Sequence, residues 1–168
     1  MTFEEWINNL IRTGNLCSGY SEKVSSSKSK LQMMRIVLDA NGISYLPEMD
    51  SKGLPLPYDT ILREFKNYIN GNYIAQFSND KGHGYSSSIY CCYSEGNEIK
   101  VESTLSAYLG CSNVTLKIQE NDFVHLYIDK NCDIMIDCPD SSKCIVDYWE
   151  GARIGFSSGK ENIVLTKR

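Results

Sequence analysis

The chain has 168 residues, of which 42% are hydrophobic, so it is long enough to bury a core in one or two small domains. Seventeen basic and 21 acidic residues give a formal charge of −4 without a long run of either sign, which argues against general nucleic-acid binding. The N-terminus lacks the basic and apolar regions of an export signal, and no stretch of about eighteen apolar residues occurs. We therefore expect a cytoplasmic protein without a transmembrane segment.

Three helices are predicted in a helical N-terminal region over residues 1–70. The first begins with a capping box formed by Thr2 and Glu5, continues with apolar residues at helical spacing and ends at Gly14. A polar stretch over 18–27 separates it from the second helix, which the apolar spacing predicts within 27–42.

A third helix is predicted from Asp59 or Thr60 to Asn70-Gly71. The segment 43–59, which precedes it, contains three prolines and leaves room for one short helical turn at most. It is interpreted as a packed connector.

A β region is expected over 71–168. The runs 72–77 and 85–94 have the β-branched and aromatic content of strands, with the loop SNDKGHG between them. The segments 97–103 and 104–110 continue the β pattern without matching the register of the residues that follow. No flexible linker separates the two regions, so we expect them to pack together.

The clearest pattern is a ten-residue repeat that starts at residue 111. Polar turn residues separate short runs in which alternate positions are apolar. When the chain from residue 111 is written in lines of ten residues, three columns are mainly apolar. The fourth column holds Val114, Val124, Ile134, Cys144, Ile154 and Val164; the sixth holds Leu116, Leu126, Ile136, Val146 and Phe156 and ends in Thr166; the eighth holds Ile118, Ile128, Cys138 and Tyr148. These columns are predicted to face a common interior.

The fold class predicted is α+β, with the helices followed by a right-handed β-solenoid of ten-residue strand and turn units. An antiparallel β-meander or sandwich is the alternative. Hairpins favour Asn-Gly or Asp-Gly turns, which the repeat lacks, so the turns favour the solenoid. Six units at two per coil make about three coils, with the helices capping one end and Lys167-Arg168 discouraging edge pairing at the other.

Several segments resemble small uncharacterised proteins of tailed phages and prophages of gut bacteria: SKLQMMRIVLDANGISYLPEM, LPLPYDTILREFKNYINGNYIA and GYSSSIYCCY. The lines around IDKNCDIMIDCP and DYWEGARI are similar to the decapeptide repeats of phage-associated β-solenoids. The resemblance covers most of the chain from about residue 28, and it implies no activity and no catalytic residue. The turn alanine typical of such decapeptides occurs here only as Ala152.

The seven cysteines are expected to pack in the protein core and not to bind a metal. No CxxC pair exists, and the only histidines are His83 and His125, so neither a metal site nor a cofactor is expected. The register places Cys138 and Cys144 on inward columns, where free cysteine acts as a small hydrophobe.

One loop carries residues that could support catalysis. Asp80, Lys81 and His83 lie beside a serine cluster on a glycine-flanked segment, which would suit a small hydrolase or transferase centred on 80–84. The loop matches no phosphate-binding or nucleophile motif, and a histidine between glycines is more often a solvated turn. A non-enzymatic protein is therefore favoured.

The positions between the inward columns predict a binding surface for a protein partner, made of His125, Tyr127, Met135, Asp137, Ile145 and Trp149. Three alternatives could cover this surface: the N-terminal helices, a second copy in a homo-oligomer, or a foreign protein. The leading hypothesis is a phage or prophage accessory protein that binds a protein through its β surface, in host interaction or anti-defence. A structural, virion-associated assembly protein is the alternative.

Overall fold

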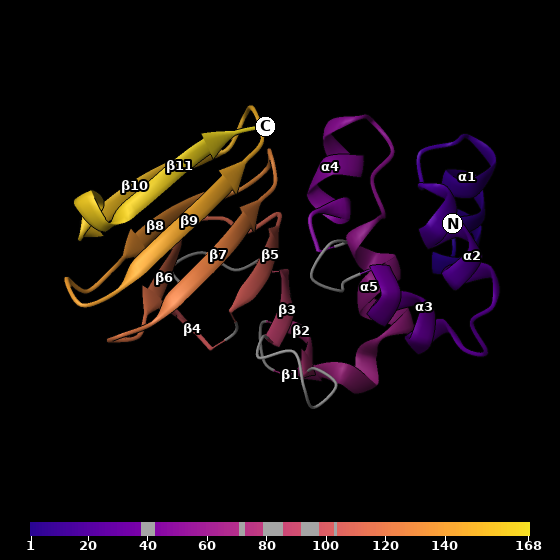
Figure 1. Cartoon of the computed structure of the whole chain (residues 1–168), viewed down its shortest axis with the longest axis horizontal. Helices are drawn as coiled ribbons and strands as arrows, with labels where there is room; N and C mark the ends of the chain where they lie inside the picture. The colour runs from indigo at the N-terminus through magenta and orange to yellow at the C-terminus, as the bar shows by residue number, and fades with distance from the viewer. Residues whose placement is uncertain (38–42, 71–72, 79–85, 92–97, 103) are drawn as a thin grey trace.

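The computed structural model describes residues 1–37, 43–70, 73–78, 86–91, 98–102 and 104–168. Helices at the N-terminal side are followed by a β-solenoid of about three turns (Figure 1). The fold class predicted from the repeat is confirmed, because the stacked strands of the repeat pair in parallel and not as a meander.

The described N-terminal residues form five short helices, whereas three were predicted. The capping box of Thr2 and Glu5 is present at the first one. The helices are α1 (Phe3–Arg12), α2 (Ser18–Ser25), α3 (Lys30–Val37), α4 (Tyr45–Ser51) and α5 (Tyr58–Glu64), and a 3-10 turn η1 (Lys66–Tyr68) follows α5.

The two additional helices lie where the sequence predicts irregular chain. Helix α2 lies in the polar stretch. It buries a single side chain, Val24, so its sequence has no apolar stripe that would predict a helix. Helix α4 accommodates Pro47 because that residue lies in the first turn, where a backbone N–H has no partner within the helix. The third predicted helix is shorter than expected, since Ile69 and Asn70 form strand β1 (Ile69–Asn70).

The strands form two sheets. The seven-stranded sheet has the order β1-β2-β3-β5-β7-β9-β11, and the four-stranded sheet has the order β10-β8-β6-β4. The further strands are β2 (Tyr73–Ser78), β3 (Ser86–Cys91), β4 (Glu98–Val101), β5 (Leu105–Leu109), β6 (Val114–Ile118), β7 (Phe123–Ile128), β8 (Asp133–Asp137), β9 (Lys143–Tyr148), β10 (Arg153–Ser158) and β11 (Ile163–Lys167). Strands β1, β2 and β3 are antiparallel, and every other pairing is parallel.

Each coil of the solenoid contains two ten-residue units, one in each sheet. Val114 therefore pairs with Ile134, and Val124 pairs with Cys144, twenty residues further along the chain. The inward columns are confirmed as the interior, because these side chains are all buried: Val114, Leu116, Ile118, Val124, Leu126, Ile128, Ile134, Ile136, Cys138, Cys144 and Val146. Tyr148, Ile154 and Phe156 pack against them and are partly buried.

The last unit departs from the predicted register. Ile163, and not Val164, pairs with Cys144, so Val164 and Thr166 lie on the outward side of β11. The turn before this strand contains Gly159 in the left-handed conformation and a 3-10 turn η2 (Lys160–Asn162), which shortens the repeat by one residue. A shift of one residue moves every side chain of a strand to the other face.

Strand β5 is buried on both faces. Its inward residues Ser106 and Tyr108 lie in the solenoid, while Ala107 and Leu109 belong to the core of the helical region. A strand with two buried faces loses the alternation of apolar and polar residues. This double burial explains why the segment 104–110 did not match the repeat, and it joins the two cores through one strand.

We expect Gly159→Ala to lower the free energy of unfolding by at least about 2 kcal/mol. Gly159 has a φ of 61°, and a Cβ atom there would overlap the carbonyl oxygen of Cys138 in the coil below. Gly53→Ala is the matched control, because its φ is 75° and no atom lies within 4 Å of the added carbon. Denaturant titration should show a loss of about 1 kcal/mol for the control. Equal losses would contradict the close approach of the two coils.

Candidate binding site

The predicted surface residues lie on two opposite faces of the solenoid. His125 and Tyr127 of β7 and Ile145 of β9 point outward from the seven-stranded sheet. Met135 and Asp137 of β8 point outward from the four-stranded sheet. The two outer faces look in opposite directions because both sheets turn their alternate residues toward one interior. The six residues therefore do not form one surface.

The helical region covers part of the outer face of the seven-stranded sheet. Ala107 and Leu109 are buried in the helical core, and Leu105 and Tyr127 pack against it. Of the three occupants considered for this face, the chain's own helices thus account for the part over β5. The area beside β7 and β9 lies at the margin of that cover.

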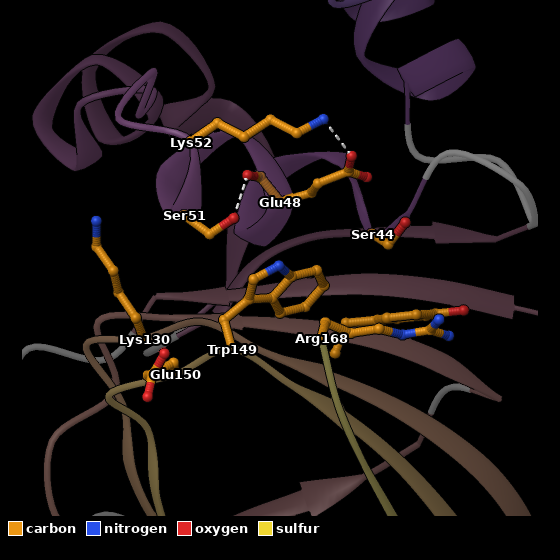
Figure 2. Close-up of a pocket in the computed structure, with 9 residues that line it drawn as sticks. Ser44, Glu48, Ser51, Lys52, Lys130, Trp149, Glu150 and Arg168 are labelled. Atoms are coloured by element: carbon orange, nitrogen blue, oxygen red, sulfur yellow. Dashed lines mark hydrogen bonds and ion pairs between the residues drawn. The ribbon is translucent and has the colours of Figure 1, made fainter.

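A cavity of about 760 Å³ opens at this margin, between α4 and the ends of β7, β9 and β11 (Figure 2). We call it the α4 groove. Its lining residues come from α4 and the residue before it, from strand β7, from the solenoid turns and from the residue after β11: Ser44, Glu48, Ser51, Lys52, Tyr127, Lys130, Trp149, Glu150 and Arg168.

Trp149 forms the centre of the groove floor. The residue is 6% exposed, and its indole ring stands up from the sheet toward α4 (Figure 2). Among the described residues, the indole N–H meets no hydrogen-bond acceptor, in contrast to Trp6, whose Nε1 donates to the carbonyl oxygen of Leu54 at 2.9 Å. A buried donor without an acceptor costs free energy, so this N–H is a point where an acceptor on a bound molecule would be stabilised.

The charged side chains of the groove are held by ion pairs. Lys52 binds Glu48 at 2.6 Å within α4, Glu150 binds Lys167 at 2.9 Å, and Arg168 binds Asp147 at 2.7 Å. The rim therefore presents charges of both signs in fixed positions around an aromatic floor.

Asp147 lies buried below the groove and accepts hydrogen bonds from two side chains. His125 Nε2 lies 2.9 Å from Asp147 Oδ2, and the Arg168 guanidinium binds the same oxygen. The hydrogen bond with Asp147 raises the pKa of Arg168, and burial raises the pKa of Tyr127. This network fixes the last residue of the chain against the sheet.

A histidine beside an aspartate is also found in hydrolases, so the other ring nitrogen decides the interpretation. His125 Nδ1 faces the Tyr127 hydroxyl at 3.5 Å, and the two rings stack with centroids 4.4 Å apart. A stacked tyrosine fixes the imidazole but does not supply an activated nucleophile. The geometry therefore favours a structural role for the pair.

A polar cluster below α4 sets the position of this helix over the sheet. Lys130 Nζ donates to the Asp50 carbonyl oxygen at 2.8 Å, and Asn131 Nδ2 donates to the Asp50 carboxylate at 2.9 Å. Asp129, which is buried in the adjacent turn, accepts the backbone N–H groups of Gly110 and Asn131. Burial, followed by the negative charge of Asp129, raises the pKa of Asp50.

The cysteines with described side chains divide into one exposed residue, Cys17, and four buried in the solenoid: Cys111, Cys132, Cys138 and Cys144. The placement of Cys138 and Cys144 on inward columns is confirmed. Burial raises the pKa of Cys144 to about 12, so its thiol is protonated and unreactive. Among the described residues, no group of three or more metal-ligating side chains gathers.

The loop residues considered for catalysis, Asp80, Lys81 and His83, lie outside the described residues. The hydrolase hypothesis centred on 80–84 thus stays a prediction.

Comparisons with protein-family models, curated proteins and solved structures found no match to this chain. Within the described ranges, no helix has the length and apolar character needed to span a membrane.

Sequence reasoning found Tyr127 and Trp149 but missed the rest of the groove. Lys130 and Glu150 lie in turns, where charged residues are expected in any case, and Arg168 was interpreted only as protection of an edge strand. Glu48 and Lys52 were missed because the prolines of the segment 43–59 argued against a helix at the position of α4. The four-residue spacing of these two opposite charges was the one available signal of a helix.

We predict that Asp50→Asn changes how stability depends on pH. The pKa of Asp50 is raised in the folded protein above the ordinary carboxyl pKa of 3.8. Ionisation of this carboxyl therefore lowers stability as the pH rises from 3.8 through the pKa of the folded protein. The stability of the unsubstituted protein relative to the Asp50→Asn variant should therefore fall with rising pH across that window. Denaturant titrations of both proteins at several pH values measure it. A difference that stays constant or grows with pH would contradict the buried position of Asp50.

Proposed function

We propose that this protein acts by binding another protein, and that the α4 groove is the contact site. The observation that carries the proposal is the gathering of Tyr127, Trp149 and Arg168 in one cavity. Tryptophan, tyrosine and arginine are the residues most enriched where protein interfaces concentrate their binding energy. These three come from separate strands and turns, so the fold brings them together.

Two further properties of the groove support a protein partner. Paired charges on the rim provide polar contacts around an apolar centre, as in the usual arrangement of an interface. The unpaired indole N–H of Trp149 could donate a hydrogen bond to a carbonyl oxygen, which every peptide backbone offers. Polar links to Asp50 hold α4 in place, so the groove is formed before the partner arrives.

The biological setting of the proposal comes from the resemblance to small phage and prophage proteins. An accessory protein that captures a host protein, in host interaction or anti-defence, needs a preformed binding surface and no reactive centre. The groove is of that kind. A structural role in an assembly is the second candidate, and the open edge of β11 is the observation that favours it.

The proposal is tested by placing a photo-crosslinking amino acid in the groove of the full chain within its native host cell. Lys52 is the substitution site, because it is exposed on the α4 side of the groove. Met135 is the matched control, since it is also exposed but lies on the opposite face of the solenoid. Each crosslinked product is identified by mass spectrometry.

We expect position 52, and not position 135, to capture a defined protein. Trp149→Phe should weaken that capture severalfold, because phenylalanine keeps the aromatic ring but lacks the N–H donor. Capture of the same protein at both positions, or no capture at position 52, would contradict the groove as the contact site.

A further inference from the structure

Each charged side chain that lines the α4 groove has an ion-pair partner in the same chain. The pairs are Lys52 with Glu48 at 2.6 Å, Glu150 with Lys167 at 2.9 Å, Arg168 with Asp147 at 2.7 Å and Lys130 with Asp50 at 3.7 Å. Each pair joins one basic and one acidic residue, so the charges around the groove cancel. The described lining residues therefore offer a bound molecule no unpaired charge.

Trp149 differs from the charged residues because its polar group has no partner. The residue is only 6% exposed, and within the described part of the chain no acceptor meets its indole N–H. Figure 2 shows the indole nitrogen on the side of the ring that faces α4, so the donor points into the groove. A buried donor of this kind costs free energy until an acceptor binds it.

These two properties limit the chemistry of the group that the groove can bind. A carboxylate or phosphate would bring a negative charge that no unpaired cation balances, and an ammonium or guanidinium group would bring an unbalanced positive charge. A hydrocarbon group would leave the Trp149 N–H without an acceptor. An uncharged acceptor satisfies both conditions, and in a protein the most abundant one is the amide carbonyl.

A carbonyl is available to the groove only where the partner's own structure does not use it. Carbonyl groups inside helices and sheets are already hydrogen-bonded, whereas those of an extended segment are free to accept. The cavity of about 760 Å³ has the size of sites that enclose small ligands, so it admits a short segment and not a folded domain. The rings of Tyr127 and Trp149 provide apolar contact for a side chain of that segment.

We propose that the α4 groove binds a short, extended and uncharged segment of its partner, and that a main-chain carbonyl of this segment accepts the Trp149 indole N–H. The inference rests on the proposed function and names the part of the partner that is recognised. Because the charges of the groove cancel, binding does not depend on ionic strength.

The first test is a screen of random short peptides, acetylated at the N-terminus and amidated at the C-terminus, against the full chain. We expect the selected peptides to lack acidic and basic residues. Their dissociation constants should change by less than about twofold between low salt and about 0.5 M salt, where charge interactions are screened. Selection of charged peptides whose affinity falls with added salt would overturn the proposal.

The indole signals in a ¹⁵N NMR spectrum test the hydrogen bond itself. The chain has two tryptophans, and Trp6 is the internal control because its Nε1 already donates to the Leu54 carbonyl oxygen at 2.9 Å. A selected peptide should shift the Trp149 signal alone, which Trp149→Phe identifies by its loss. Single alanine substitutions in the peptide should keep this shift, because the main chain supplies the acceptor. A bound peptide that leaves the Trp149 signal in place, or one that loses the shift when a single Asn or Gln is replaced, would contradict the proposal.

Glu48→Gln tests the balance of charge in the groove. The substitution keeps the size of the side chain but leaves Lys52 without its ion-pair partner. Peptides selected against this variant should contain Asp or Glu, and their affinity should fall with salt. Glu98→Gln is the matched control, since it breaks the ion pair of Glu98 with Lys117 at 2.9 Å on the four-stranded sheet. An unchanged preference in Glu48→Gln, or an equal change in both variants, would overturn the inference.

The photo-crosslinking experiment separates the failure of this inference from the failure of the proposed function. Capture of a protein at position 52, together with selection of charged peptides or of no peptide, would overturn the inference and leave the groove as a contact site. Loss of both the capture and the peptide binding would overturn both proposals.

Discussion

The structure depends on one packing constraint, which is that every second side chain of each short strand must enter an interior shared with the coils above and below. Val114, Ile134 and Ile154 lie one above the other for this reason, and the same holds for Leu116, Ile136 and Phe156. No single coil can bury its own apolar face, so stability comes from stacking. The turns between strands must then keep the coils in register, and Gly159 shows how closely successive coils approach.

This constraint also positions the candidate site. Because the interior uses alternate residues, those between them point outward in straight rows, and the row on β5 became the attachment surface of the helices. The helices cover β5 but not the ends of β7 and β9. The contact of Asp50 with Lys130 and Asn131 holds α4 above the turns, and the α4 groove is the space between them. A helical region and a repeat region thus create a site that neither contains alone.

The sequence predicted the solenoid well because its signal is periodic and local. It was less informative where tertiary contacts override periodicity: strand β5 lost its alternation through burial on both faces, and the last repeat shifted by one residue at the turn containing Gly159. The predicted surface was divided between two faces because ten-residue units alternate between the sheets, so Tyr127 and Met135 point in opposite directions. The groove combines segments far apart in the chain, and a single sequence carries no signal of that proximity.

Two neighbouring substitutions in β8 probe the shared interior of the solenoid. Ile136 is fully buried in the solenoid interior, whereas Met135, next to it, is 41% exposed on the outer face. Ile136→Ala should lower the free energy of unfolding by about 2–5 kcal/mol in a denaturant titration, because it leaves a cavity in the stacked core. Met135→Ala should change it by no more than about 0.5 kcal/mol. Equal losses, or a larger loss at Met135, would contradict the shared interior on which the fold and the groove depend.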